Sequence, residues 1–180
     1  MRIAVILLTV MYPFAIYYGL QHWDIRYLVL LLLVIAGLRL IPGDGGWISR
    51  IVGIGLLALL VAWTWLSQSA TGLKLYPVVI NVYLLMLFGW TLARPPSMIE
   101  RFARRQDPEL NPQGVLYTRR VTQVWCGFFV FNIAVATWTA LLGSDAQWAL
   151  YNGFIAYVLM GLIFLGEWLV RRRVMADTHQ

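Results

Sequence analysis

Two groups of arginines are the residues of this chain best suited to binding chemistry. The first lies in the segment from Arg94 to Pro112, RPPSMIERFARRQDPELNP, which interrupts a mostly apolar sequence, and the second follows shortly after it. A basic residue close to an anionic membrane surface contributes about 1 kcal/mol to binding. An acidic protein could dock on the same charges. The candidate residues for binding a lipid or a partner are Arg101, Arg104, Arg105, Arg119 and Arg120.

Three polar side chains lie inside long apolar runs and form a second candidate site, Asn81, Asn132 and Glu167. Amides in such positions usually hydrogen-bond a neighbouring membrane helix, typically for about 0.6 and at most about 2 kcal/mol. A polar binding site between helices is the alternative. Glu167 precedes Arg171 by four residues, which is the favourable order for an ion pair along a helix. A proton-handling carboxylate is the alternative for Glu167.

Familiar catalytic and metal-binding patterns are missing from the sequence. It has no HExxH, CxxC or P-loop motif, and its two histidines are His22 and His179. Asp107 and Glu109 flank a proline and do not form a paired-carboxylate motif of the prenyl-transfer type. We therefore predict no catalytic residues, no metal site and no cofactor. The sequence favours a non-enzymatic protein over an enzyme built from Arg, Asn and Glu.

The composition shows which solvent must surround these residues. Of the 180 residues, 61% are hydrophobic and 12% are charged, whereas soluble domains have about 45–50% and about 25%. A chain of this kind cannot cover a water-exposed surface, so lipid is its natural solvent. The net charge of +6 then indicates membrane topology and anionic lipid rather than nucleic acid.

The apolar runs predict an all-α, polytopic membrane helix bundle with about six transmembrane helices. They form a single transmembrane domain over 1–180, with an N-terminal half at 1–73 and a C-terminal half at 74–173. The first run reads as a retained span, because no small-x-small cleavage site follows it. The second and third runs are shorter than the ~17–25 residues of a typical span, and a re-entrant pair is the alternative for them. The six runs are 3–20, 27–41, 51–66, 75–93, 121–142 and 149–170.

The basic residues predict which ends of these spans face the cytoplasm. If the N-terminus is cytoplasmic, only Arg26 and Lys74 fall outside and the other 12 basic residues fall inside. The positive-inside rule therefore favours cytoplasmic N- and C-termini. Tryptophans near the predicted span ends, including Trp125, Trp148 and Trp168, are typical of the aromatic belt at a membrane interface.

The arginine-rich segment itself contains a predicted short cytoplasmic helix over 98–106. Ser97 and Glu100 have the spacing of a capping box, and the prolines before them end the preceding span. Met98, Ile99, Phe102 and Ala103 fall on one side of this helix. A basic amphipathic helix next to a membrane predicts an interfacial anchor, and a docking surface for anionic lipid or an acidic partner is the alternative.

Several blocks of the C-terminal half carry a resemblance to a known family. They are KLYPVVINVYLLMLF, RPPSMIER, YTRRVTQVWCGFFVFNIAVA and WALYNGFIAYVLMGLIFLGEWLVRRR. Over residues 74–173 the chain resembles uncharacterised bacterial inner-membrane proteins whose genes often lie in aryl-polyene or xanthomonadin-type pigment clusters. It is more distantly similar to the intracellular septation protein A family. The resemblance implies a multi-pass protein of the bacterial inner membrane and supplies no catalytic residues.

Two functions remain open at this stage. In the first, the protein is a non-enzymatic scaffold or lipid-binding component that supports envelope lipid or aryl-polyene-type synthesis. Its basic face would bind anionic lipids or an acidic cytoplasmic protein such as an acyl carrier protein, and a homo-oligomer is compatible with the sequence. In the second, it is a small carrier or flippase with Asn81, Asn132 and Glu167 lining the path. A groove containing these polar groups would favour the carrier, whereas hydrogen bonds between helices would favour the scaffold.

Overall fold

The computed structural model describes the C-terminal half of the chain continuously and a few helical residues before it. The described residues are 71–177 together with 11, 13–19, 22, 27, 51, 54, 55, 58, 59, 61–64 and 66. All regular structure in this part of the chain is helical. The predicted span 27–41 falls almost entirely outside the described residues, and 3–20 and 51–66 are described only in part, so the possible re-entrant pair also lies mostly outside them.

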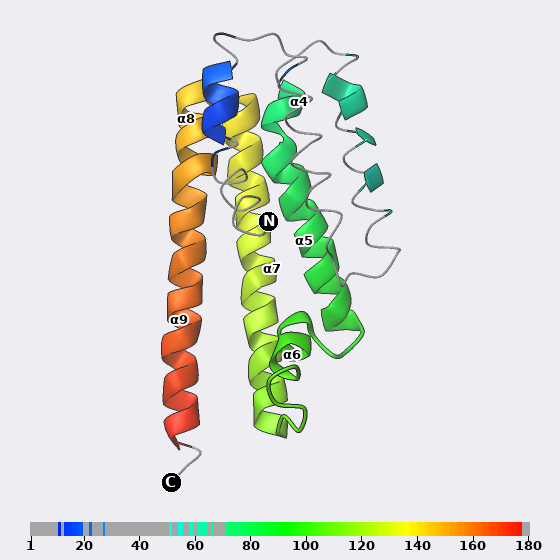
Figure 1. Ribbon diagram of the computed structural model, residues 1–180, viewed down its shortest axis with the longest axis vertical. Coiled ribbons are helices and arrows are strands. Elements are labelled where there is room, and N and C mark those ends of the chain that lie inside the picture. The colour runs from blue at the N-terminus through cyan, green and yellow to red at the C-terminus, as the bar shows by residue number, and fades with distance from the viewer. Residues whose placement is uncertain are drawn as a thin grey trace.

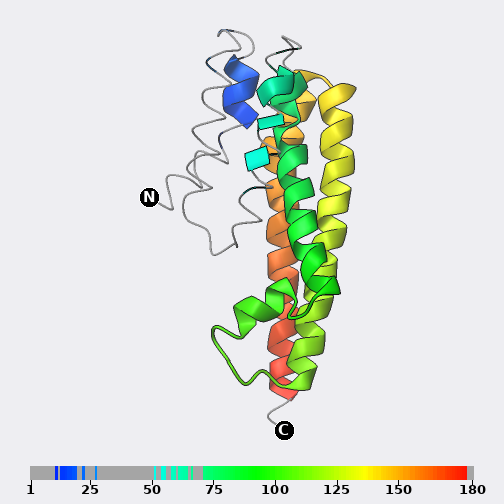
Figure 2. The same ribbon diagram turned by 90° about the vertical axis from the view of Figure 1, so that its right-hand side faces the viewer.

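Three long helices run side by side and are joined by shorter ones (Figures 1 and 2). In chain order the helices are α4 (Thr71–Lys74), α5 (Tyr76–Ala93), α6 (Met98–Ala103), α7 (Pro112–Leu141), α8 (Asp145–Leu150), the π-helix η1 (Tyr151–Ile155) and α9 (Ala156–Asp177).

Three helical segments are long and apolar enough to cross a membrane: Thr71–Ala93, Pro112–Leu141 and Asp145–Arg171. They coincide with the last three predicted spans, so an all-helical fold with three candidate membrane-spanning helices is confirmed for the described residues, whereas the total of six stays a prediction. Buried residues make up 39% of the apolar window in α7, but 11% in α4–α5 and 6% in α8–α9. α7 is therefore the central helix of the described bundle, and most of the apolar window of the two outer helices is not buried.

Local sequence signals fix the ends of the helices around α7. The Asn111 side chain caps α7 by accepting a hydrogen bond from Gly114 N at 2.7 Å, and Pro112 occupies the first turn, where a missing N–H is tolerated. At α8, Ser144 and Gln147 form a reciprocal capping box. Both signals fix the residue at which a helix starts.

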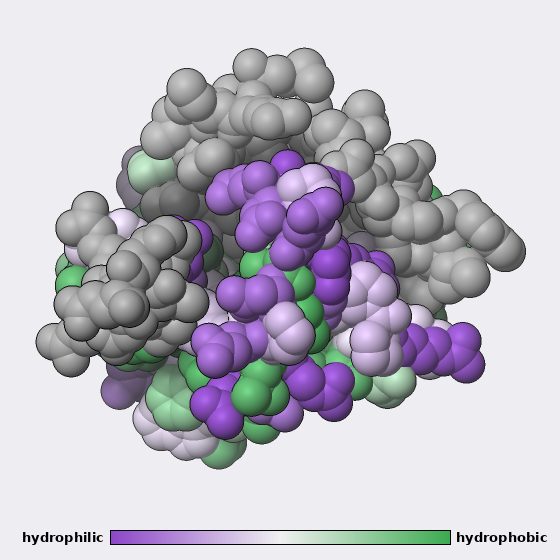
Figure 3. All heavy atoms as spheres, turned by 90° about the horizontal axis from the view of Figure 1, so that it is seen from below, coloured by the Kyte–Doolittle hydropathy of each residue, from purple (hydrophilic) through white to green (hydrophobic). Residues whose placement is uncertain are grey.

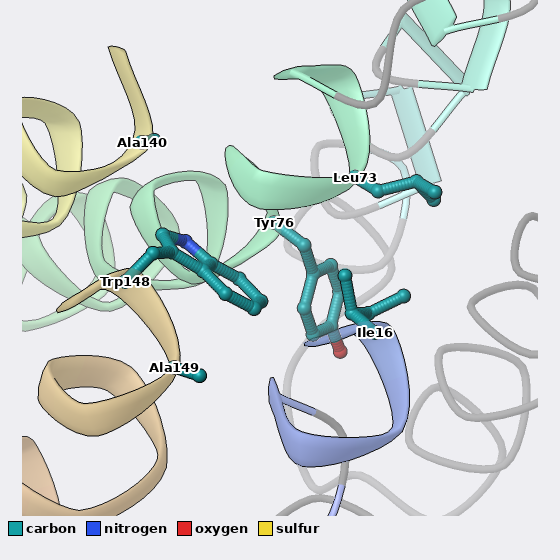
Figure 4. Close-up of a cluster of buried hydrophobic side chains, with 6 residues drawn as sticks. All are labelled: Ile16, Leu73, Tyr76, Ala140, Trp148 and Ala149. Atoms are coloured by element: carbon teal, nitrogen blue, oxygen red, sulfur yellow. The ribbon is translucent and has the colours of Figure 1, made fainter. Parts of the chain in front are cut away.

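The first core cluster lies at the end of the bundle that carries α4 and α8. Figure 4 shows the rings of Trp148 and Tyr76 beside each other, with Ile16 next to Tyr76. The Trp148 indole N–H donates to Lys74 O at 2.9 Å, and the Lys74 ammonium pairs with the Asp145 carboxylate. These contacts join the end of α4 to α8, two segments more than 70 residues apart in sequence.

The second core cluster fills the space between α5, α7 and α9 with aromatic rings. Its buried members are Val121, Trp125, Phe128 and Phe129 of α7. The Trp125 and Phe164 ring centroids are 4.8 Å apart, so an α7 ring bridges to α9. Two of the predicted belt tryptophans are thus core residues, because Trp125 and Trp148 are 6% and 0% exposed; Trp168 is partly exposed.

Candidate functional site

The arginine-rich segment gathers at one end of the bundle. α5 ends there, α7 begins there, and the C-terminal end of α9 lies beside them (Figure 1). Viewed from this end, hydrophilic residues alternate with apolar ones on the described surface (Figure 3). Lys74 lies at the opposite end with α8. The structure therefore places the arginines of residues 94–120 and Arg171 near the end of α9 at the same end of the bundle, as the charge pattern predicts.

The short helix α6 is docked on the bundle through its first backbone amides. Met98 N donates to the Thr91 hydroxyl at 2.9 Å, and Ile99 N donates to the Thr122 hydroxyl at 3.3 Å. The first N–H groups of a helix have no partner within that helix, so these threonines of α5 and α7 satisfy them. Met98 is buried and Ile99 packs on the aromatic cluster.

A buried carboxylate holds the loop around α6. Glu100 is 5% exposed and accepts hydrogen bonds from Ser97 N at 3.2 Å and from the Arg104 guanidinium at 2.9 Å. Arg104 also donates to Pro108 O, and Arg101 donates to Pro96 O. Two of the candidate binding arginines therefore bind the protein's own loop.

The predicted amphipathic helix is confirmed in its start, and it is shorter than predicted. Ser97 N donates to the Glu100 carboxylate at 3.2 Å, as the capping-box spacing predicts, whereas the Ser97 hydroxyl has no hydrogen-bond partner among the described residues. α6 ends at Ala103 rather than at 106. On the predicted apolar side Met98 is buried and Ile99 packs on the aromatic cluster, while Phe102 is half exposed.

A cleft of about 550 Å³ opens between α6 with its following loop, the first turns of α7 and the last turns of α9. Its lining is mostly polar where α7 begins and apolar from residue 121 onward along α7. The polar and charged lining residues include Gln106, Asp107, Asn111, Gln113, Glu167 and Arg171. The apolar lining residues include Ile99, Phe102, Leu110, Val121, Trp125 and Phe164.

Three polar side chains connect α7 to α9 at the wall of this cleft. The Tyr117 hydroxyl lies 3.0 Å from Glu167 O and 3.3 Å from the Glu167 carboxylate, both of which can accept its proton. The Arg171 guanidinium lies 3.7 Å from the same carboxylate, so the predicted ion pair along the helix is confirmed. The Glu167 and Arg171 side chains are 21% and 49% exposed, and both can therefore meet a ligand in the cleft.

The other candidate arginines lie outside the cleft. Arg105 places its guanidinium 5.7 Å from the Phe102 ring centroid. Arg120 is exposed and Arg119 is half buried, and neither lines the cleft. Among the described residues that line it, Arg171 is the only basic one. The structure thus separates the basic surface from the cleft.

The two candidate amides make different hydrogen bonds, and neither faces the cleft. Asn132 is buried in α7 and accepts from the Tyr151 hydroxyl of η1 at 2.6 Å, so the bond between helices predicted for it is confirmed. Asn81 donates to Pro77 O in its own helix at 2.8 Å, a bond to the carbonyl one turn back that polar side chains in helices often make. The bond to a neighbouring helix predicted for Asn81 is not seen among the described residues and stays a prediction.

A π-turn next to Asn132 adds further polar contacts. Asn152 of η1 donates to Trp148 O at 2.9 Å and lies 3.4 Å from the buried Thr139 hydroxyl of α7. A π-turn shifts backbone hydrogen bonding by one residue, and the Asn152 amide supplies a donor to the Trp148 carbonyl. Hydrogen bonds between polar side chains therefore link α7 to η1. They pair Asn132 with Tyr151 and Thr139 with Asn152.

Sequence reasoning predicted the pair of Glu167 and Arg171 that lies in the cleft wall but missed Tyr117 there and the two threonines that dock α6. The ion pair of Glu100 was also missed, although Arg104 follows it by four residues in the same short helix. Tyr117, Thr91 and Thr122 carried no such signal, since each binds a residue on another helix.

Comparison with known proteins adds no relative. No protein-family model, curated protein or solved structure matches the chain. The resemblance of residues 74–173 to aryl-polyene-associated inner-membrane proteins therefore stays a prediction, and the geometry of the cleft is the basis for a function.

Proposed function

We propose that this protein is a non-enzymatic membrane component that binds the headgroup and upper acyl chain of a membrane lipid in the cleft between α6, α7 and α9. The observation that carries this proposal is the graded lining of the cleft. Asp107, Glu167 and Arg171 belong to its polar lining, and Trp125 and Phe164 belong to its apolar lining.

The position of the cleft along the helices fits an amphiphile. Its polar lining residues on α7 precede the apolar run that begins at residue 121, and its aromatic residues lie within the apolar runs of α7 and α9. Lipid headgroups and acyl chains meet at the same boundary. The headgroup of a lipid lying along α7 would thus meet the polar lining residues, and its acyl chain would meet the aromatic rings.

The polar contacts within the bundle favour binding over transport. Asn132 is paired with Tyr151, and Asn81 is bonded to its own helix. Glu167 is the only one of the three intramembrane candidates that lines the cleft. A continuous polar path would need all three side chains on one open groove, so the carrier alternative loses its main support.

The basic end of the bundle gives this component an orientation and a recruiting surface. We place it on the cytoplasmic side of a bacterial inner membrane, in accord with the positive-inside rule. Arg105, Arg119 and Arg120 would then attract anionic lipid or an acidic protein such as an acyl carrier protein. The assignment to envelope lipid or aryl-polyene-type synthesis rests on the sequence resemblance alone.

Retention of lipid by the purified protein tests the binding function. The full chain is extracted in mild detergent and examined by native mass spectrometry for bound lipid. Ala103→Phe places a ring in the cleft, because Ala103 lines it, and should abolish the retained lipid. Leu116→Phe, on the exposed side of α7, enlarges a side chain outside the cleft and should leave it bound.

A photoactivatable lipid gives an independent reading of the same site. Its cross-links should map to the peptides that contain Trp125 and Phe164. Equal lipid retention in Ala103→Phe and the parent, or cross-links spread evenly over the outer faces of α5 and α9, would refute the cleft as a binding site.

A further inference from the structure

The charges that line the cleft differ in sign from those of the end of the bundle around it. Residues 94–120 and 167–171 contain seven arginines and four acidic residues, so this end as a whole is positive. The described lining of the cleft contains one arginine, Arg171, and two carboxylates, Asp107 and Glu167. The cleft is therefore an acidic recess in a basic surface.

The balance of charges in the cleft constrains the lipid that can fill it. A headgroup with phosphate alone would meet one guanidinium and two carboxylates, and repulsion by the carboxylates would offset the attraction of Arg171. A headgroup that also carries an ammonium offers its phosphate to Arg171 and its ammonium to the two carboxylates. Its three N–H donors can be shared between the Glu167 and Asp107 carboxylates.

The geometry at Glu167 leaves room for such a donor. One carboxylate oxygen, Oε1, is the atom that lies near both the Tyr117 hydroxyl and the Arg171 guanidinium. The guanidinium is held at 3.7 Å, which is longer than a hydrogen bond, and its side chain is half exposed. A phosphate can therefore bind Arg171 while an ammonium binds the remaining oxygen of Glu167.

From these charges we propose that the cleft selects an amine-bearing zwitterionic phospholipid of the phosphatidylethanolamine class over a purely anionic one. The phosphate binds Arg171, the ammonium binds Glu167 and Asp107, and the upper acyl chain packs on Trp125 and Phe164. This inference rests on the proposed lipid-binding function and adds a headgroup to it. The sequence analysis predicted binding of anionic lipid. That prediction still applies to the exposed arginines outside the cleft, but the cleft itself would select a zwitterionic lipid.

A competition between two lipids tests the headgroup preference. The full chain is equilibrated with equimolar phosphatidylethanolamine and phosphatidylglycerol of identical acyl chains, and the first bound lipid is counted by native mass spectrometry. The parent should retain mainly phosphatidylethanolamine. Glu167→Gln removes one carboxylate–ammonium contact and should lower the ratio of the two adducts by about tenfold or more, the effect of a single hydrogen bond to a charged group.

Three further variants separate the contributions. Asp107→Asn lies in the exposed loop, where it leaves the helices intact, and should lower the ratio in the same direction. Arg171→Gln removes the partner of the phosphate common to both lipids, so both adducts should decrease while their ratio changes little. Arg120→Gln, outside the cleft, should weaken only the phosphatidylglycerol adducts that form on the basic surface.

The outcomes distinguish a failure of this inference from a failure of the binding function. Retained lipid that is mainly phosphatidylglycerol, or an adduct ratio unchanged in both Glu167→Gln and Asp107→Asn, would overturn the headgroup preference and leave lipid binding in place. Adducts that survive Ala103→Phe unchanged would overturn the cleft itself. Free phosphoethanolamine added in excess should not displace the lipid, because it lacks the chain that contacts Trp125 and Phe164.

Discussion

Removing the buried carboxylate of Glu100 should detach α6 from the bundle without unfolding the long helices. Glu100→Ala deletes two hydrogen bonds, one from Ser97 N at 3.2 Å and one from Arg104 at 2.9 Å. The first is buried and has a charged acceptor, a class that contributes about 1.5–3 kcal/mol. The second has a partner that is 39% exposed, so solvent limits it to about 0.5–1 kcal/mol. The docked state of α6 should lose about 2–4 kcal/mol in total.

Hydrogen exchange at the docking amides measures this loss directly. Met98 N and Ile99 N donate to threonine hydroxyls of α5 and α7, and they exchange only when α6 leaves those threonines. A loss of about 2–4 kcal/mol in local stability corresponds to exchange faster by about 30- to 1,000-fold. Exchange in the middle of α7 should not change, since neither lost bond lies there.

The matched control is Glu109→Ala, which removes an exposed carboxylate from the same loop. If Met98 and Ile99 exchange equally slowly in Glu100→Ala and Glu109→Ala, Glu100 does not hold α6, and the reasoning from its burial fails. Faster exchange throughout α7 would refute the separation of local from global stability. A milder Glu100→Gln variant retains an acceptor for Ser97 N, so its effect should be smaller than that of alanine.

Three further predictions concern the bundle and its orientation. Asn132→Leu and Tyr151→Phe should each lower the free energy of unfolding in detergent by about 0.6–2 kcal/mol. The double variant should lose little more than either single variant, because both changes remove the same hydrogen bond. Additive losses would contradict this pairing. Gly153→Ala should destabilise the protein, since a Cβ at this position would lie 2.8 Å from the Phe14 ring. Gly161→Ala, where a Cβ would have nothing within 4 Å, should be neutral or stabilising. Thermal denaturation of the two variants checks this, and equal melting temperatures would argue against the close approach at Gly153. Reporter fusions after Gln180 and in the loop before α7 should both report the cytoplasm, and a periplasmic signal from either would overturn the predicted topology.

Interactions within one helix turn could be predicted from this sequence. The bond from Ser97 N to the Glu100 carboxylate and the ion pair between Glu167 and Arg171 are present, because both depend on residues three or four apart on a helix. The last three apolar runs likewise lie within the helices α5, α7 and α8–α9. Local spacing and hydropathy carry this information directly.

Contacts between helices could not be predicted, since they depend on which faces meet. Trp148 has the position of a belt residue, yet it is buried against Lys74 O. Asn81 and Asn132 look equivalent in sequence, but only Asn132 faces a hydroxyl on a neighbouring described helix. Rotation of a helix by one residue turns its side chains through about 100°, and apolar runs this continuous do not determine that rotation.

The cleft follows from a helix that is longer than its apolar run. α7 begins at Pro112, nine residues before the run that starts at 121, and at 1.5 Å per residue it extends about 13 Å beyond that run. This extension carries Gly114, Tyr117 and Thr118, all of which line the cleft, and gives the end of α9 a surface to pack on. Topology needs positive charge near the membrane but no particular contacts, whereas the cleft needs particular contacts and little positive charge. For this reason two different sets of residues lie at this end of the bundle. The arginines predict which side of the membrane it faces, and the lining residues of the cleft would recognise a ligand. Arg171 belongs to both sets.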